Sequence, residues 1–265
     1  MIDGALPYLR CPICEQALNR VERALRCPRG HSFDLARQGY ADLSAGRLPH
    51  VGDTAEMVAD REAFLAAGHY DFIADALAAR VPGGLVLDAG VGTGGYLARV
   101  LDSKPAATGL GVDVSKPALR RAARAHPRAA AVLADLWRPL PIADGVAAAV
   151  LNVFAPRNGA EFRRVLRPGG VLLVVTPAAG HLRELVEAYD LIRVDPDKEE
   201  RVREALDDHF AMADRVTLGR ELCLSAAEAR TLIGMTPSAR HLPRAPQEAL
   251  TVTAAVHLTA YRPRH

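Results

Sequence analysis

A glycine-rich segment that follows an apolar run is the feature that most constrains the fold of this chain. The run Leu85–Leu87 continues as Asp88-Ala89-Gly90-Val91-Gly92-Thr93-Gly94-Gly95. Glycine has no Cβ atom, so its backbone turns sharply between a strand and a helix and lets a ligand approach closely. This segment therefore predicts a strand-to-helix turn of the kind that binds a nucleotide-like ligand above a parallel sheet.

The remainder of the chain alternates apolar runs of strand length with amphipathic stretches of helix length. The expected strands are Leu85–Leu87, Thr108–Val112, Ala130–Leu133, Val146–Leu151, Val171–Val175, Arg215–Leu224 and Leu250–Tyr261. Expected helices run from Asp53 or Thr54 to Val81 with a break at Gly68, then over Gly95–Leu101, Lys116–Ala125, Gly159–Leu166, His181–Leu191, Asp195–Asp208 and onward from Ser225. Central strands that are apolar throughout predict a parallel α/β sheet with helices on both faces.

Length and charge limit the domain organisation and the class of partner. With 265 residues and a net charge of +2, the chain has room for one large domain and a small attachment, and it lacks a strong overall field. We expect a small module at 1–45 and the large domain at 46–265. The chain shows neither a signal-peptide pattern nor an apolar run near the roughly 18 residues of a membrane helix, so a cytoplasmic location is expected.

Three of the four cysteines gather near the N-terminus in a pattern typical of a metal site. Cys11-Pro-Ile-Cys14 is followed by Cys27-Pro-Arg-Gly-His31, whereas Cys223 stands alone. Zinc prefers four thiolate or imidazole ligands in a tetrahedron, and two such turns supply them. The alternatives are ordinary buried cysteines and a redox pair, although the first pair does not open a helix after a strand. We expect one structural zinc ion, bound by Cys11, Cys14, Cys27 and His31.

Acidic residues at three successive strand ends favour S-adenosylmethionine (SAM) over a nicotinamide or flavin nucleotide, which the glycine pattern alone would also allow. Asp88 stands two residues before the first glycine, where it can reach an ammonium group. Asp113 ends the second expected strand, where it can accept both ribose hydroxyls, and Asp135 follows the third, where it can bond the adenine amino group. The expected cofactor residues are Asp88, Gly90, Gly92, Thr93, Gly94, Asp113, Asp135 and Leu136.

Several further segments form a distinctive combination with the cysteine–histidine pattern: Gly52–Met57, Arg61–Tyr70, Phe154–Pro156, Leu232–Pro237, and Thr176-Pro177 followed by His181-Leu182. Through this combination, nearly the whole chain resembles the RlmA family of 23S rRNA guanine-N1 methyltransferases. The resemblance implies a class I SAM-dependent methyltransferase with a Rossmann-like seven-stranded sheet, acting on a guanine in the hairpin 35 loop of domain II. It also implies that Tyr70 and His181 lie beside the cofactor, that the protein forms a homodimer, and that one branch confers resistance to tylosin-type macrolides.

Methyl transfer from a sulfonium asks mainly for alignment of nucleophile, methyl and sulfur, together with removal of the guanine N1 proton. The segment from Asn152 to Pro156 departs from the Asn/Asp-Pro-Pro-aromatic pattern of amino-methyltransferases. We expect Asn152, the candidate catalytic residue, and Phe154–Pro156 at the floor of the base pocket, and the sequence identifies no general base. Two alternatives stay open: a SAM-dependent enzyme for a small molecule, and a zinc-ribbon regulatory protein with an inactive SAM domain.

Two groups of arginines are candidates for contact with RNA phosphates. The first group, beside the expected zinc ligands, is Arg20, Arg23, Arg26 and Arg29. The second group, Arg120, Arg121, Arg124 and Arg128, is expected on the helix after the second strand, where a solvated helix face explains it as well. A metal-held module beside a catalytic domain commonly presents the substrate, so the first group is the stronger candidate.

Overall fold

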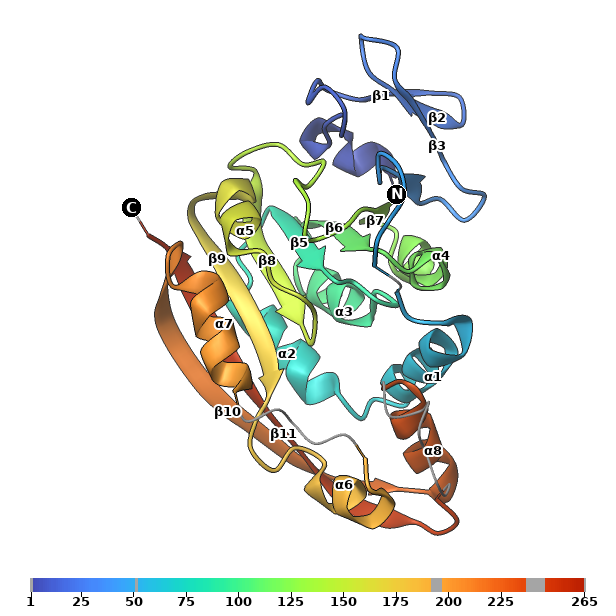
Figure 1. Ribbon diagram of the computed structural model, residues 1–265, viewed down its shortest axis with the longest axis vertical. Coiled ribbons are helices and arrows are strands. Elements are labelled where there is room, and N and C mark those ends of the chain that lie inside the picture. The colour runs from blue at the N-terminus through green and yellow to red at the C-terminus, as the bar shows by residue number, and fades with distance from the viewer. Residues whose placement is uncertain (1, 51, 192–196, 237–245, 265) are drawn as a thin grey trace.

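The computed structural model describes residues 2–50, 52–191, 197–236 and 246–264, with only the backbone described at 198 and 199. Its centre is an eight-stranded sheet in the order β10-β11-β9-β8-β5-β6-β7-β4, with helices on both faces (Figure 1). A separate sheet of three short strands lies beyond one end of the large sheet (Figure 1). No helix in the described ranges is long and apolar enough to span a membrane.

The strands of the large sheet confirm the expected parallel core, and an antiparallel pair closes the sheet at one edge. Strands β4 to β9 are linked by parallel pairings, whereas β11 is antiparallel to β9 and β10 is antiparallel to β11. Their bounds are β4 (Ala41–Asp42), β5 (Leu85–Ala89), β6 (Thr108–Asp113), β7 (Ala129–Leu133), β8 (Ala147–Val153), β9 (Leu166–Pro177), β10 (Phe210–Leu224) and β11 (Leu250–Pro263).

One strand exceeds the expected seven. Strand β4 pairs in parallel with β7, and the backbone N–H of Leu43 donates to the carbonyl of Leu133 at 3.0 Å. Two residues are too few to show an alternating pattern, which is why the sequence did not indicate this strand. The expectation of a seven-stranded sheet is corrected to seven strands plus this short edge strand.

The helices follow the expected pattern closely. They are the 3₁₀ helix η1 (Ile2–Tyr8), then α1 (Ala55–Ala66), α2 (Asp71–Arg80), α3 (Gly95–Ser103), α4 (Lys116–Ala125), α5 (Gly159–Val165), α6 (Arg183–Tyr189), α7 (Lys198–Leu206) and α8 (Ala226–Gly234). Thr54 caps α1 by accepting from the backbone of Met57, and the break expected at Gly68 separates α1 from α2. Residues 195 and 196 of the expected acidic helix, and Pro237 of the RlmA-like segment, lie outside the described ranges.

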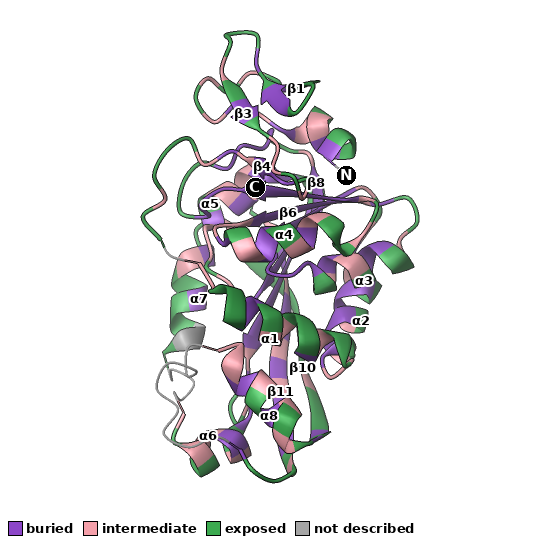
Figure 2. Ribbon diagram, turned by 90° about the vertical axis from the view of Figure 1, so that its right-hand side faces the viewer, coloured by how far each residue is buried: buried purple, intermediate pink, exposed green. Residues whose placement is uncertain are grey.

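Two apolar cores lie on the two faces of the sheet. Neighbouring side chains of a strand point to opposite faces, so Val86 joins the core that contains Phe64 of α1, while Leu87 joins the core that contains Phe162 of α5. The strands of the parallel core from β5 to β9 are buried along most of their length, whereas the edge strand β10 is largely exposed (Figure 2). This rigid sheet places the carboxyl ends of β5, β6, β7 and β8 side by side.

The N-terminal module is attached to the sheet by main-chain hydrogen bonds as well as by β4. It consists of η1, β1 (Asn19–Val21), β2 (Ala24–Arg26) and β3 (Ser32–Asp34). The N–H of Arg10 donates to the carbonyl of Pro141 at 2.9 Å, and the N–H of Ala143 donates to that of Tyr8 at 2.8 Å. The expected boundary near residue 45 remains a prediction.

Candidate metal site and cofactor pocket

The four predicted metal ligands converge in the N-terminal module. Their ligand atoms all lie within 4.8 Å of one another. Nδ1 of His31 is 3.3 Å from Sγ of Cys27 and 3.5 Å from Sγ of Cys11, and Sγ of Cys14 is 3.7 Å from Sγ of Cys27. Tetrahedral zinc bonds imply separations of about 3.5–3.8 Å between such atoms. The donor set and its spacing therefore fit one zinc ion.

Two tight turns present these ligands. The carbonyl of Cys11 accepts from the N–H of Glu15 at 2.8 Å, and the carbonyl of Cys27 accepts from the N–H of Gly30 at 2.9 Å. Gly30 has a φ of 85°, a conformation that glycine adopts without the steric cost of a Cβ atom. The backbone itself thus brings each pair of ligands together, and the spacing in the sequence reflects that local geometry.

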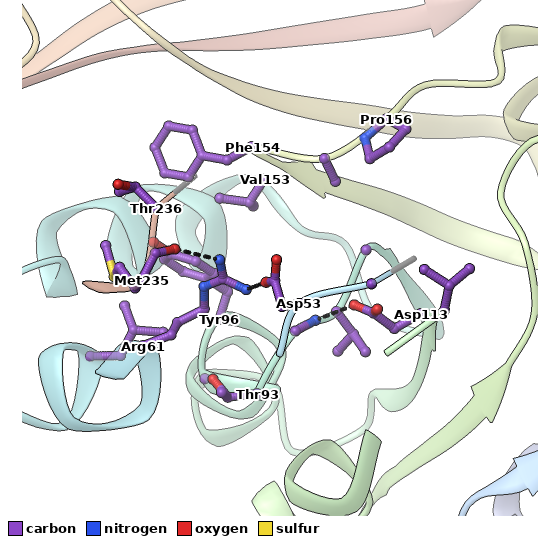
Figure 3. Close-up of a pocket in the computed structure, with 18 of the residues that line it drawn as sticks. Asp53, Arg61, Thr93, Tyr96, Asp113, Val153, Phe154, Pro156, Met235 and Thr236 are labelled. Atoms are coloured by element: carbon purple, nitrogen blue, oxygen red, sulfur yellow. Dashed lines mark hydrogen bonds and ion pairs between the residues drawn. The ribbon is translucent and has the colours of Figure 1, made fainter. Parts of the chain in front are cut away.

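A cavity of about 560 Å³ opens at the carboxyl ends of β5, β6, β7 and β8 (Figure 3). Its volume lies within the range of small-molecule sites. The structure places most of the predicted cofactor residues in its wall, namely Tyr70, Gly90, Gly92, Thr93, Asp113, Asp135, Leu136 and His181. The other two predicted cofactor residues, Asp88 and Gly94, are not among the residues that line the cavity, and neither is Asn152, which was expected at the floor of the base pocket.

The glycine segment forms the sharp turn that its composition predicts. Gly90, Gly92 and Gly94 have φ values of 90°, 53° and 85°. A Cβ atom on Gly90 would come within 2.4 Å of the Cβ of Ala155, and one on Gly94 within 2.9 Å of the Cβ of Ala125. Both the backbone conformation and the close approach of neighbouring elements therefore require glycine at these two positions.

Two carboxyl groups lie close to this turn in different environments. Asp113 accepts from the N–H groups of Gly92 at 2.9 Å and Ser115 at 2.8 Å, and burial raises its pKa. Asp88 is only 1% exposed, and its burial, together with the charge of Asp113, raises its pKa to about 8. A cation brought against Asp88 would offset the cost of burying its charged form.

The third carboxyl group is held by residues that the sequence did not single out. Oδ2 of Asp135 lies 2.9 Å from Nδ1 of His50, and Oδ1 accepts from the N–H of Trp137 at 3.0 Å. His50 and Trp137 both line the cavity. Nothing in their local sequence pattern marks them, since His50 lies near the start of the second expected domain and comes to Asp135 only through the fold.

Arg61 is the single Lys or Arg among the described residues that line the cavity. Its guanidinium pairs with Asp53 and donates to the carbonyl of Met235 at 3.0 Å (Figure 3). It belongs to the RlmA-like stretch from Arg61 to Tyr70, so a charge argument applied to that stretch would have found it. It supplies positive charge in a pocket whose other fixed charges are carboxylates.

Three aromatic rings form one part of the wall. The ring centroids of Tyr70, Phe154 and His181 lie 6.1–6.4 Å apart. Phe154 has a φ of 53°, uncommon for a residue with a side chain, and is 39% exposed. Unusual backbone conformations of this kind persist where the surroundings enforce them, often at functional sites. The ring of Phe154 is thereby presented at the pocket.

Asn152 supports the loop that carries Phe154. Its side-chain amide donates to the carbonyls of Ala89 at 3.1 Å and Pro156 at 2.8 Å, and the residue is fully buried. Its Oδ1 atom has no hydrogen-bond partner among the described residues. Of the segment expected at the pocket floor, Phe154–Pro156 lines the cavity, whereas Asn152 ties that loop to the end of β5.

One of the four arginines expected on the helix after the second strand lies outside that helix, α4. Arg128 lies beyond the end of α4, and its guanidinium donates to the carbonyls of Leu101, Lys104 and Ala107. Three backbone acceptors make it a structural group that joins the ends of neighbouring elements. The expectation that it lies on the helix with Arg120 is therefore wrong.

Comparison with known proteins decides the family. Residues 9–44 match the zinc-ribbon family described as RlmA, N-terminal, and residues 86–170 match a family described as methyltransferase domain. The chain is 50% identical over 248 residues to the 23S rRNA (guanine(748)-N(1))-methyltransferase of Streptomyces fradiae, covering 91% of this chain and 89% of that protein. The chain belongs to the RlmA family.

A second RlmA relative covers the chain more completely. A Micromonospora griseorubida protein assigned as a 23S rRNA (guanine-N1)-methyltransferase is 55% identical over 294 residues, which span 99% of this chain and all of that protein. Among solved structures, a chain from the complex of the Haloferax volcanii Trm112 methyltransferase activator with a methyltransferase has a TM-score of 0.53 at 20% identity, covering 82% of this chain and 100% of that chain. That likeness supports the fold alone.

Membership of the RlmA family fits both the metal site and the cofactor pocket of this chain. The methyltransferase domain implies SAM as the methyl donor, and the zinc ribbon with its Cys11, Cys14, Cys27 and His31 cluster fits one structural zinc ion. These matches favour an enzyme over the regulatory alternative and an RNA acceptor over a small molecule.

Proposed function

We propose that this chain transfers the methyl group of SAM to N1 of a guanine in 23S rRNA, in the hairpin 35 loop of domain II. The observation that carries the proposal is the 50% identity, over 91% of this chain, to the Streptomyces fradiae enzyme whose name states methylation of a 23S rRNA guanine at N1. The hairpin 35 loop is what the RlmA resemblance implies. The cavity at the carboxyl edge of the sheet gives the reaction a place, and its wall supplies the groups that such chemistry needs.

The carboxyl groups suit the polar parts of SAM. We assign Asp113 to the ribose hydroxyls, Asp135 to the adenine amino group, and Asp88 to the ammonium group. The turn over Gly90–Gly94 lets the cofactor approach the backbone closely. When bound, SAM supplies a methyl group carried on a positively charged sulfur. The protein's part is to hold that methyl group in line with the incoming nitrogen, which lowers the entropic barrier to transfer.

Arg61 completes the charge complementarity. SAM carries a carboxylate as well as its cationic groups, and Arg61 is the fixed cation in the described part of the cavity wall. Its guanidinium stands next to the glycine turn, 3.6 Å from where a Cβ atom of Gly92 would lie. We therefore assign Arg61 to the cofactor carboxylate, with Asp53 holding the guanidinium in place.

The aromatic part of the wall suits a flat base. The target guanine must leave its stack to reach the methyl group, which is cheaper in a loop than in a duplex. Phe154 and His181 offer faces on which it can stack, with Tyr70 beside them. Asn152 holds the Phe154 loop through its hydrogen bonds to the carbonyls of Ala89 and Pro156.

Two basic surfaces suit the RNA backbone. Arg23, Arg26 and Arg29 are exposed on the zinc module, whereas Arg20 is paired with Asp3. On α4, the exposed Arg120 and Arg124 have no ion-pair partner among the described residues and line a cavity of about 390 Å³ together with Arg99 and Arg121. Like charges at i and i+4 destabilise a helix, so an anionic partner is the physical reason to keep them.

The reaction is tested by reverse transcription of 23S rRNA after incubation with the protein and SAM. Methylation at N1 blocks Watson–Crick pairing, so we expect a strong stop at one guanine that disappears without SAM and in the Asp113→Ala variant. Mass analysis of the nucleosides should identify 1-methylguanosine. A stop at an adenine, or methyl label recovered only in small molecules, contradicts the proposal.

Three finer parts of the proposal have separate tests. Tolerance of a sensitive bacterium to tylosin-type macrolides should rise when this chain is expressed, if the chain belongs to the resistance branch that the RlmA resemblance implies. A homodimer should elute at twice the chain mass of 28.4 kDa in light-scattering chromatography. A cytoplasmic location follows from the ribosomal RNA substrate, and fractionation of cells tests it.

A further inference from the structure

The segment that joins the two parts of the chain forms part of the cofactor pocket. His50, Gly52 and Asp53 follow the zinc module and precede α1, and all three line the cavity. A linker that only connected two units would be free to run over solvent. This one crosses the carboxyl ends of β6 and β7, next to the groups that we assign to the ribose and the adenine.

The segment is fixed after His50 by contacts with α4 and α1. The backbone carbonyl of Asp53 accepts from the hydroxyl of Ser115 at 2.8 Å, and the side chain of Asp53 pairs with Arg61. A Cβ atom on Gly52 would come within 2.7 Å of the Cβ of Ser115, so only glycine allows this approach without a shift. These contacts set where the linker can place His50.

His50 in turn fixes one carboxylate. Its Nδ1 lies 2.9 Å from Oδ2 of Asp135, and the N–H of Trp137 occupies Oδ1. The Asp135 side chain is 2% exposed, while that of His50 is 50% exposed. The carboxylate is therefore oriented by a donor on each oxygen, yet each oxygen keeps lone pairs for another donor.

We propose that His50 is a positioning residue that makes the pocket selective for the adenine base of the cofactor, by orienting the Asp135 carboxylate toward the exocyclic amino group. This inference rests on the proposed role of Asp135. An amino group donates to the oriented carboxylate. A hypoxanthine base carries a carbonyl oxygen at the same position, and two acceptors face to face repel each other. Rejection of that base is the property that His50 contributes.

The experiment compares two ligands by calorimetry: S-adenosylhomocysteine, and its deaminated analogue with hypoxanthine in place of adenine. For the unaltered full-length protein we expect the adenine ligand to bind about ten- to hundredfold more tightly, the range that one charge-assisted hydrogen bond gives. In His50→Ala the ratio should fall at least about threefold, and in His50→Gln, whose amide can still donate, it should recover in part.

Two further variants separate the possible outcomes. Asp135→Asn should bring the ratio close to one, because an amide can donate to the carbonyl of hypoxanthine. His126→Gln changes a histidine that pairs with Asp102 at 3.4 Å outside the pocket, and it should leave the ratio unchanged. Melting curves of all variants establish that each is folded. A ratio is measured on folded protein at equal conditions, so general destabilisation does not change it.

The outcomes distinguish this inference from the proposed function. If Asp135→Asn abolishes the selectivity and His50→Ala leaves it intact, the role of His50 is wrong while the assignment of Asp135 stands. If neither variant changes the ratio, the assignment of Asp135 to adenine fails and the inference fails with it. The inference is supported if the affinity ratio drops in both Asp135→Asn and His50→Ala and recovers in part in His50→Gln.

Discussion

The metal site and the cofactor pocket are built in opposite ways. All four metal ligands come from one stretch of 11–31, and two local turns bring them together. The cofactor pocket takes residues from His50 to Thr236, contributed by the ends of the strands β5 to β9, by loops and by the helices α1, α3 and α8. A site like the metal site can be predicted from residue spacing, whereas a site like the cofactor pocket depends on which strands become neighbours.

The two sites also differ in what happens when their ligand is removed. Three thiolates at separations of 3.3–3.7 Å from their neighbours need a cation between them, and the module's own strands are only three residues long. Next to the pocket, the buried Asp88 can take up a proton instead, since burial raises its pKa to about 8. Loss of zinc should therefore unfold its module, whereas the empty pocket should persist.

The largest effect is expected from a substitution that removes a ligand of the metal site. Cys27→Ser removes one of four zinc ligands, so the module should lose its metal and its fold, and rRNA methylation should fall more than about 100-fold. The affinity for SAM should fall by less than about tenfold, because the sheet and its glycine turn remain. Zinc content, methyl transfer and calorimetry with SAM measure the three quantities.

The matched control is Cys223→Ser, which changes an exposed thiol on β10 far from the metal cluster in the sequence. Its zinc content and activity should equal those of the unaltered protein. Full methylation by zinc-free Cys27→Ser protein would show that the module is not needed for the reaction.

The next prediction separates the contribution of Asp88 to SAM affinity from its contribution to the stability of the protein. Asp88→Asn removes the carboxylate that we assign to the ammonium group of SAM, so affinity should fall about ten- to hundredfold. The same change should stabilise the ligand-free protein at pH 9 by at least about 1 kcal/mol, or about 2–4 °C in Tm. Calorimetry and melting curves at several pH values measure both.

The sign of the stability change follows from the pKa of Asp88, which burial raises from 3.8 to about 8. Between these values the native chain holds a proton that the unfolded chain has released, so this carboxyl group lowers stability as pH rises. The difference between the variant and the unaltered protein should vanish near pH 4. An Asp88→Asn protein that melts lower at pH 9 would be inconsistent with a buried, ligand-poised carboxyl group.

The smallest effect concerns the basic surface on α4. Replacing Arg120 and Arg124 by Ala should weaken RNA binding about three- to thirtyfold and reduce the slope of log affinity against log salt by about 1.4–1.8, as expected for two lost phosphate contacts. Arg203→Ala is the control, because Arg203 pairs with Glu200 on α7, which covers the other face of the sheet. An unchanged salt slope in the double variant would show that Arg120 and Arg124 lie on a solvated helix face that does not contact RNA phosphates.

Much of the fold was predictable from local pattern. The apolar runs identified all the strands of the parallel core except β4, and α4 was expected at its observed bounds, Lys116–Ala125. The glycine-rich segment predicted the turn at the end of β5, where Gly90 and Gly94 adopt positive φ values. These features are local, because a short stretch of residues decides backbone conformation and which side chains face a core.

The tertiary structure alone decided which groups meet in the pocket. His50 reaches Asp135, which is 85 residues away in the sequence, and Arg61 reaches the backbone of Met235. No periodicity or spacing records such encounters, because they depend on strand order and on the path of a linker across the sheet. The sequence by itself determined the metal ligands, the glycine turn and the acids at the strand ends. The fold decided their partners, because contacts between distant segments exist only after the strands have paired.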